Sequence, residues 1–166
     1  MKAKSFAGMN CSIAGALELI GDRWALLLVR DMSLGLGRFD DLRASIGIPA
    51  ATLAARLRHL ESSGIVERAR YQERPPRDDY RLTRKGRDLW KVTLALREWG
   101  DRWDATGLGA VPVEAVDRES GRPLKLALVD AETGEPVPPA RMRLRPGPAA
   151  DATTRRRLAV SADASS

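Results

Sequence analysis

Apolar residues recur at three- and four-residue spacings along the first hundred positions, which is the period of helices that bury one face. The first such stripe lies in residues 12–20 and ends at Gly21. Asp22 can cap a second helix that begins directly after it. Residues 38–46 carry a third, shorter pattern, and Pro49 follows in a tight turn. These patterns predict three short helices before residue 50.

A fourth helical pattern spans residues 50–62 and repeats leucine at spacings of four and three. We expect Leu53, Leu57 and Leu60 to be buried, and Gly64 to end the helix as a C-terminal cap. The opposite side of the helix holds small and polar residues that we expect to be exposed, namely Thr52, Ala55, Arg56 and His59.

A β-hairpin is predicted after the fourth helix. Residues 65–71 alternate apolar and polar side chains, and residues 79–82 form the return strand. The two prolines within residues 72–78 predict a loop between the strands. Thr83 can then cap a long helix that reaches about Asp104. Helices, a hairpin and a further helix in this order predict a winged helix-turn-helix, mainly α with a small β-wing.

The last of these helices has a heptad pattern, with apolar residues alternately three and four positions apart. That spacing is typical of a helix that packs lengthwise against another helix. A packing face within one chain is the alternative interpretation, but two tryptophans near the helix end favour a homodimer. The expected interface residues are Leu89, Val92, Leu96, Trp99 and Trp103.

The sequence pattern changes after residue 105. This region holds seven of the ten prolines, and the turn sequences ESGRP (119–123) and ETGEP (132–136) lie thirteen residues apart. Apolar stretches beside these turns predict strands, and therefore a small β-hairpin-like appendage. The last residues are small or charged and predict disorder. The expected domains are 1–105 for the winged helix and dimerisation, 106–147 for the appendage, and 148–166 for a disordered tail.

Charge and composition indicate the class of partner. The chain carries a formal net charge of +6, and residues 47–91 alone hold eleven lysines and arginines against six acids. Such a balance favours double-stranded DNA. No apolar stretch approaches the roughly 18 residues that span a bilayer, so we expect no membrane partner and a cytoplasmic location. The single cysteine excludes a cysteine-based zinc site, and no nucleophile–base pair or phosphate loop indicates an enzyme.

Several sequence motifs follow one another in a fixed order. They include NCSIAGAL (10–17), IGDRWALLLVR (20–30), RFDDL (38–42), TLAARLRHLE (52–61) and PPR (75–77). Together they resemble the HxlR family of bacterial transcriptional regulators, which are relatives of the MarR group. The resemblance covers residues 10 to about 104 and implies a dimeric winged-helix repressor or activator of nearby genes. Members usually have Ser-Pro-Lys before the recognition helix, where this chain has Pro49-Ala50-Ala51.

Small side chains on a helix allow close approach to the DNA major groove. Arg56 is a candidate for a bidentate contact to guanine, with an ion pair to a nearby acid as the alternative. The wing prolines stiffen the loop, so that its arginines can reach the minor groove or phosphates. His59, without a second ligand or catalytic partner, is expected at solvent or at a phosphate. The expected DNA-contacting residues are Arg38, Thr52, Ala55, Arg56, His59, Arg74, Arg77 and Lys85.

Cys11 precedes the first predicted helix, a position where a thiol can become reactive. In some members of the resembled family, a cysteine at this position senses oxidants by forming a disulfide across the dimer. A buried, unreactive cysteine is the alternative. Trp24, Trp99 and Trp103 could instead line a cavity for a planar small-molecule effector between subunits, although core packing is the commoner role of such residues.

The sequence therefore predicts a dimeric regulator, more specifically a repressor, that reads a palindromic operator with two recognition helices. A winged helix used for protein interaction or DNA architecture, without sequence-specific binding, is the alternative. Some relatives carry a zinc-ribbon-like tail, and here Ser120, Asp130 and Thr133 stand where its ligands would lie. We expect neither a metal nor a cofactor.

Overall fold

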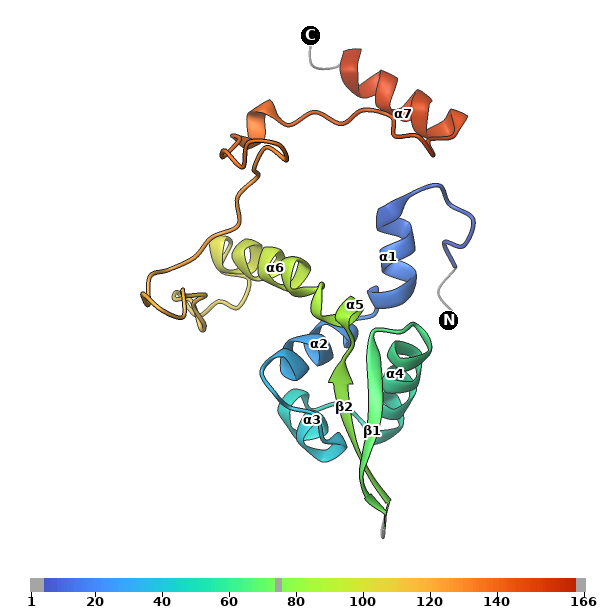
Figure 1. Ribbon diagram of the computed structural model, residues 1–166, viewed down its shortest axis with the longest axis vertical. Helices are drawn as coiled ribbons and strands as arrows, with labels where there is room; N and C mark the ends of the chain where they lie inside the picture. The colour runs from blue at the N-terminus through green and yellow to red at the C-terminus, as the bar shows by residue number, and fades with distance from the viewer. Residues whose placement is uncertain (1–4, 74–75, 164–166) are drawn as a thin grey trace. The chain divides into compact units, whose positions relative to one another are not determined.

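The computed structural model describes residues 5–73 and 76–163 of the chain (Figure 1). The chain forms two compact units, residues 19–126 in one and residues 1–18 with 127–166 in the other. In the described ranges, no helix is long and apolar enough to cross a membrane. Those same ranges contain no group of three or more His, Cys, Asp or Glu residues that could hold a metal ion.

Four helices precede the hairpin, at the positions that the sequence predicts. They are α1 (Ser12–Ile20), α2 (Ala25–Ser33), α3 (Phe39–Ile46) and α4 (Ala50–Ser62). The core of the first unit takes Leu28 from α2, Leu42 from α3, and Leu53, Leu57 and Leu60 from α4. The predicted burial of the α4 leucines is therefore confirmed.

Two glycines end helices in a left-handed conformation that other residues rarely adopt. Gly47 has a φ of 64° at the end of α3, and Gly64 has a φ of 68° beyond α4. The amide of Ile65 then donates to the carbonyl of Leu60 over 2.9 Å, so this carbonyl in the last turn of α4 has a hydrogen-bond partner. The turn that results delivers the chain directly into the first strand.

The wing hairpin is longer than its sequence predicts. Strands β1 (Val66–Glu73) and β2 (Pro76–Leu82) pair antiparallel from Val66↔Leu82 to Glu73↔Pro76, with an irregularity between Arg70 and Gln72. The prediction of a loop was wrong for residues 72–73 and 76–78, which belong to the strands, and residues 74–75 lie outside the described residues. Pro76 begins its strand, a position where the missing amide does not interrupt the ladder.

A short contact joins the loop after α2 to the wing. Arg38 forms an isolated antiparallel bridge with Asp79, and the amide of Tyr80 donates to the carbonyl of Gly37 over 2.8 Å. A Cβ atom on Gly37 would overlap the Asp79 carboxylate, so only glycine fits between the two segments. At the base of the wing, Arg38 thus pairs with strand β2 as a single-residue third strand, which the sequence pattern did not predict.

The predicted long helix after Thr83 is two helices, α5 (Arg84–Arg87) and α6 (Trp90–Arg102). Thr83 caps the first of them as expected, since its hydroxyl accepts from the amide of Gly86 over 3.1 Å. The amide of Leu89 donates to the carbonyl of Gly86, three residues back, and Leu89 packs against the core. This tightened turn separates the two helices.

Replacing Gly86 by alanine should lower the free energy of unfolding by about 1–3 kcal/mol. The added Cβ would overlap the backbone oxygen of Ile65, which cannot move without disturbing the strand. Gly100 on α6 has nothing within 4 Å of its Cβ position, so G100A should instead stabilise the chain by about 0.5–1 kcal/mol. Urea unfolding of both variants measures the contrast, and a Gly86→Ala variant as stable as the wild type would contradict it.

Two turns thirteen residues apart share one geometry. In the first, the amide of Asp117 donates to the carbonyl of Arg122, and Val116 bridges Pro123. In the second, Asp130 donates to Glu135, and Val129 bridges Pro136. Backbone amides lower the pKa of each aspartate carboxyl from its ordinary value, chiefly that of Ser120 at Asp117 and that of Thr133 at Asp130. The appendage is hairpin-like only at these turns: within the described residues, the strands predicted beside them do not form.

Part of the segment for which disorder is predicted (148–166) is helical within the described residues. After a short 3-10 helix, η1 (Pro139–Arg141), residues Ala152–Asp163 form helix α7. The amide of Thr154 donates to the carboxylate of Asp151 over 2.7 Å, and the amide of Arg155 donates to the carbonyl of Asp151. This N-cap begins a helix in a segment whose small residues obscure the helical period.

Candidate nucleic-acid interface

The face of α4 that lies opposite its buried leucines is exposed and differs from the predicted one. Its exposed residues recur at spacings of four, three and four, and they are Ala51, Ala55, Arg58 and Ser62. Thr52 is half-buried at the edge of this face. Three small side chains surround one arginine, so the helix can approach a groove closely while Arg58 reaches beyond it.

Arg56 and His59 are half-buried and thus less exposed than predicted, although 38% of the Arg56 side chain remains exposed. The guanidinium of Arg56 lies 3.6 Å from the carboxylate of Asp22, and its Nε is buried without a hydrogen-bond partner. The Nε2 atom of His59 lies 3.1 Å from the carbonyl oxygen of Leu19. Both side chains therefore contact the chain around the end of α1, where they position α4. Their expected contacts to DNA stay a prediction.

The wing neutralises part of its own positive charge. Arg68 lies 3.5 Å and Arg70 lies 3.4 Å from the carboxylate of Asp78, and Arg81 pairs with Asp79 over 2.9 Å. Arg68 also approaches Tyr80, where burial raises the phenol pKa above its ordinary value and so favours the protonated form. These ion pairs hold the described part of the hairpin in place.

The predicted wing-tip residues cannot be assessed in the same way. Arg74 lies outside the described residues, and for Arg77 only the backbone, paired with Gln72, is described. Arg38 lies at the N-terminal end of α3, and Lys85 donates from its Nζ to the carbonyl of Ser63 over 2.8 Å. Lys85 thus lies at the C-terminal end of α4, where a cation complements the helix dipole.

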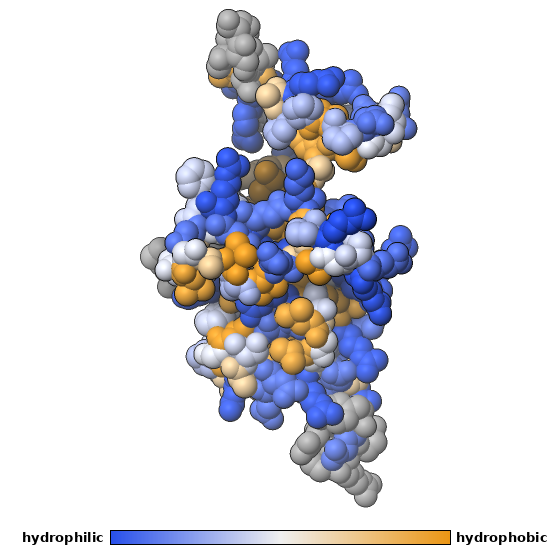
Figure 2. Space-filling view, turned by 90° about the vertical axis from the view of Figure 1, so that its left-hand side faces the viewer, coloured by the Kyte–Doolittle hydropathy of each residue, from blue (hydrophilic) through white to orange (hydrophobic). Residues whose placement is uncertain are grey.

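Helix α6 exposes most of its predicted heptad residues. Leu89 packs against the core, whereas Val92, Leu96, Trp99 and Trp103 are 39%, 51%, 61% and 64% exposed. Figure 2 shows hydrophobic residues (orange) among hydrophilic ones (blue) on one face of the surface. Single exposed apolar residues are ordinary, but a contiguous series with two tryptophans indicates a contact surface.

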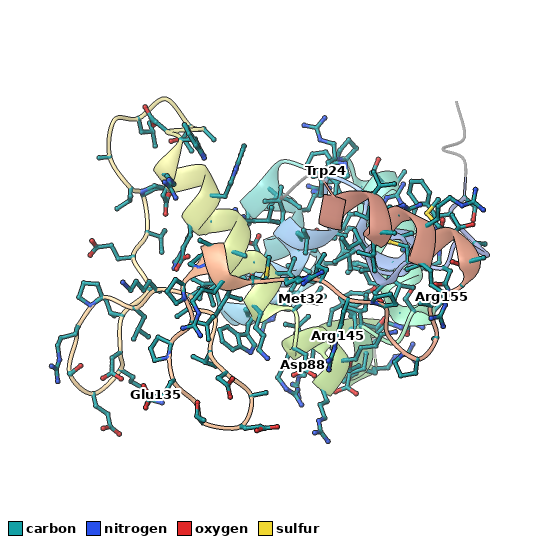
Figure 3. All side chains as sticks on the ribbon, turned by 90° about the horizontal axis from the view of Figure 1, so that it is seen from above. Trp24, Met32, Asp88, Glu135, Arg145 and Arg155 are labelled. Carbon is teal, nitrogen blue, oxygen red and sulfur yellow. The ribbon has the colours of Figure 1, made fainter. Side chains whose placement is uncertain are left out.

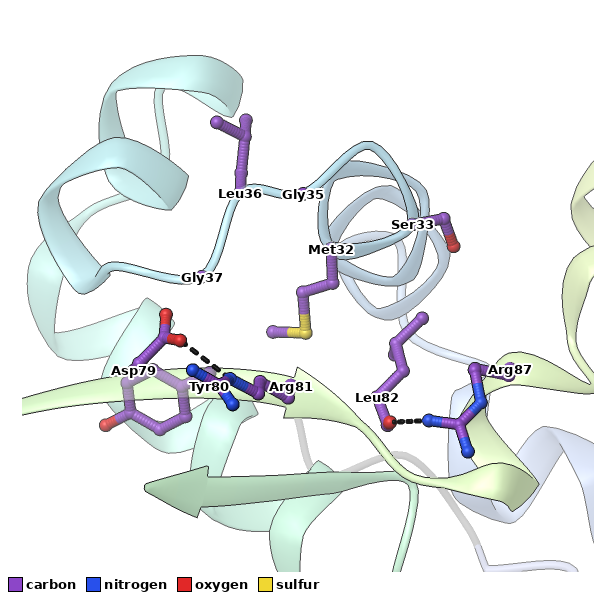
Figure 4. A pocket seen from close by; sticks show the side chains of 10 residues that line it. All are labelled: Met32, Ser33, Gly35, Leu36, Gly37, Asp79, Tyr80, Arg81, Leu82 and Arg87. Atoms are coloured by element: carbon purple, nitrogen blue, oxygen red, sulfur yellow. Dashed lines mark hydrogen bonds and ion pairs between the residues drawn. The ribbon is translucent and has the colours of Figure 1, made fainter. Parts of the chain in front are cut away.

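Two hollows border the winged helix. One, of about 620 Å³, lies between the end of α2 and strand β2, where Arg81 pairs with Asp79 and Arg87 donates to the carbonyl of Leu82 (Figure 4). The other, of about 380 Å³, is more apolar and lies between α2 and α6. Its lining includes Leu26, Arg30, Trp90, Leu96 and Arg97, but not the tryptophans that the sequence suggested for an effector cavity.

Cys11 belongs to the other compact unit and is half-buried. It directly precedes α1, and its carbonyl accepts from the amide of Gly15 over 3.0 Å. The thiol therefore lies at a helix N-terminus, as the sequence predicts. Its reactivity stays a prediction.

Comparison with known proteins agrees with this arrangement. The profile of the HxlR-like helix-turn-helix family matches residues 19–107. An HTH-type transcriptional regulator of Mycobacterium tuberculosis is 36% identical over 137 residues, which cover 82% of this chain and 86% of the relative. The crystal structure of PA1607, a proposed transcription factor, superposes with a TM-score of 0.70 at 34% identity and covers 86% of this chain and 99% of that one.

A further similar structure is that of the redox regulator HypR in its reduced form. It is 33% identical, has a TM-score of 0.54, and covers 60% of this chain and 99% of its own. The family match spans residues 19–107, which contain α2 to α6 and the hairpin, and so it agrees with the winged helix-turn-helix predicted from the sequence.

Proposed function

Since the chain belongs to the HxlR-like helix-turn-helix family, we propose that it is a homodimeric, sequence-specific DNA-binding repressor of transcription in the cytoplasm. The observation that carries this proposal is the exposed face of α4, on which Arg58 projects among small residues. Helix α4 enters the major groove, and Arg58 makes hydrogen bonds to a base edge. Arg38, Lys85 and the wing arginines contact the flanking phosphates.

The exposed apolar series on α6 supports the dimer. Pairing Leu96, Trp99 and Trp103 with the same residues of a second copy removes them from water. A two-fold dimer presents two α4 helices to major grooves about 34–36 Å apart, so the operator is palindromic.

A signal could enter at two places. Cys11 lies before α1, and the similar protein HypR is a redox regulator. The apolar groove between α2 and α6 has the size of a small-molecule site and carries Arg30 and Arg97 at its lining. We propose oxidation of Cys11 as the first of these signals to test.

Fluorescence anisotropy with the intergenic DNA beside the gene, compared with random duplex, tests the function. We expect the chain to prefer its operator by about 10³-fold or more, with an affinity that falls steeply with salt. Equal binding to both duplexes would exclude a sequence-specific regulator and favour the architectural alternative. The titration is then repeated with an oxidant on the wild type and on Cys11→Ser. A change in affinity that occurs in the wild type and not in the variant would identify the Cys11 thiol as the sensor, and an equal change in both would exclude it.

A further inference from the structure

The positive charge of the chain is concentrated in two segments. Residues 47–91, which contain α4 and the wing, have a net charge of +5. Residues 141–157 contain six arginines and one acid, Asp151, and so also have a net charge of +5. Because the whole chain has a formal charge of +6, the remaining residues sum to −4. The second basic segment, which we name the arginine arm (residues 141–157), is shorter and has the higher charge density.

The arginines of this arm are exposed, as are Arg68, Arg70 and Arg81 of the wing, but the two sets differ in their ion pairs. Arg141, Arg143, Arg145, Arg155, Arg156 and Arg157 are all exposed. The side chains of Arg145 and Arg155 are labelled in Figure 3. Among the described residues, none of the six lies within ion-pair distance of a carboxylate, although the charge of Arg157 helps to lower the pKa of Asp151, whereas Arg68, Arg70 and Arg81 in the wing each form an ion pair. The charge of the arm is therefore available to a partner.

The arm also has a defined structure at its C-terminal end. Asp151 caps α7, and the helix places Arg155, Arg156 and Arg157 about 100° apart around its axis. The hydroxyl of Thr154 lies 3.1 Å from Oδ1 of Asn10, and the side-chain amide Nδ2 of Asn10 donates to the carbonyl of Ala149 over 3.0 Å. These hydrogen bonds attach the start of α7 to the N-terminal segment.

We propose that the arginine arm is a second DNA-binding element, which contacts the phosphate backbone without reading sequence. Arginine side chains bind phosphate through paired hydrogen bonds, and clustered arginines increase both affinity and salt dependence. A membrane surface fits less well, because the apolar residues of α7 are limited to Leu158, Val160 and alanines, without the broad apolar face of a membrane-bound helix. This proposal rests on the proposed function, since it adds to DNA binding by α4.

The test is the salt dependence of binding to random-sequence duplex DNA, measured with the full chain. In R155A/R156A/R157A and in R141A/R143A/R145A, the slope of log affinity against log salt should fall in magnitude by about 0.9 for each phosphate that the variant no longer neutralises. R155K/R156K/R157K should keep the wild-type slope, because binding to a phosphate needs charge and not a particular base. Alanine and arginine both favour helix, so α7 should persist in the variants, which circular dichroism checks.

A matched control removes three exposed charges outside both basic segments, in R118A/R122A/K125A, and should leave the slope unchanged. Wild-type slopes in both arm variants would overturn the proposal. It would also be overturned if the arm variants bound DNA like the wild type but lost binding to phosphatidylserine vesicles, because the arm would then bind membranes. Preference for operator over random duplex, measured on the same proteins, tests the proposed function separately: an arm effect without operator preference would contradict only that function.

Discussion

Replacing Arg58 by alanine should weaken operator binding about 5- to 150-fold, the effect of removing one bidentate hydrogen-bonded pair with a base, worth about 1–3 kcal/mol. Arg58 lies on the exposed face of α4 among Ala51, Ala55 and Ser62, so no other side chain on that face replaces it. Binding to random duplex should change much less. Anisotropy titrations at fixed salt give both values.

Arg56 is the matched control, because it lies two residues away on the same helix. Its guanidinium pairs with Asp22, and so Arg56→Ala should alter stability by less than about 1 kcal/mol and operator affinity only slightly. Arg58→Lys should restore general DNA affinity but not base discrimination. A larger loss of operator affinity from Arg56→Ala than from Arg58→Ala would reverse this assignment.

Introducing L96E together with W99E should convert the dimer into monomers and reduce operator affinity by at least about 100-fold. Each glutamate would bury an unpaired charge in the apolar contact, which costs several kcal/mol. Operator affinity falls because the two recognition helices are no longer linked. Light scattering coupled to size exclusion measures the mass, and circular dichroism checks that α6 persists.

Lys91→Glu is the control for this change. Lys91 is exposed on α6 but lies about 115° around the helix from the apolar series, so its variant should remain dimeric. If the L96E/W99E variant kept the mass of a dimer, α6 would be excluded as the dimer interface.

Helical periodicity was sufficient to predict α1 to α4, because burial of Leu53, Leu57 and Leu60 repeats at the helical spacing. The same spacing distinguishes Arg58, which lies opposite the buried leucines, from Arg56, which lies on their flank, so the placement of Arg56 on the exposed face did not follow from the pattern. Arg56 is the nearer of the two to the buried stripe, and only the folded position of Asp22 shows that an acid pairs with it. The spacing of residues along a helix thus predicts which side of the helix is buried. It does not predict which polar side chain forms an ion pair with a residue from another part of the chain.

The remaining errors have similar physical causes. The break between α5 and α6 depends on the close packing of Gly86 against Ile65, which is a tertiary contact. The start of α7 depends on a single cap, Asp151, within a run of small residues. The length of the wing depends on Pro76 beginning a strand instead of interrupting one. Cys11 directly precedes α1, as the sequence indicates, and four of the five predicted interface residues are exposed, whereas Leu89 packs against the core of its own chain.

The glycine at the base of the wing has a mechanical consequence. With no room for a side chain at Gly37, and with Arg38 bridged to Asp79, the hairpin cannot hinge where it meets α3. We therefore expect the hairpin and α3 to move together as one rigid body relative to α2. A ligand that moves α2 away from α6 should therefore displace the hairpin together with α3 and lower the affinity for DNA.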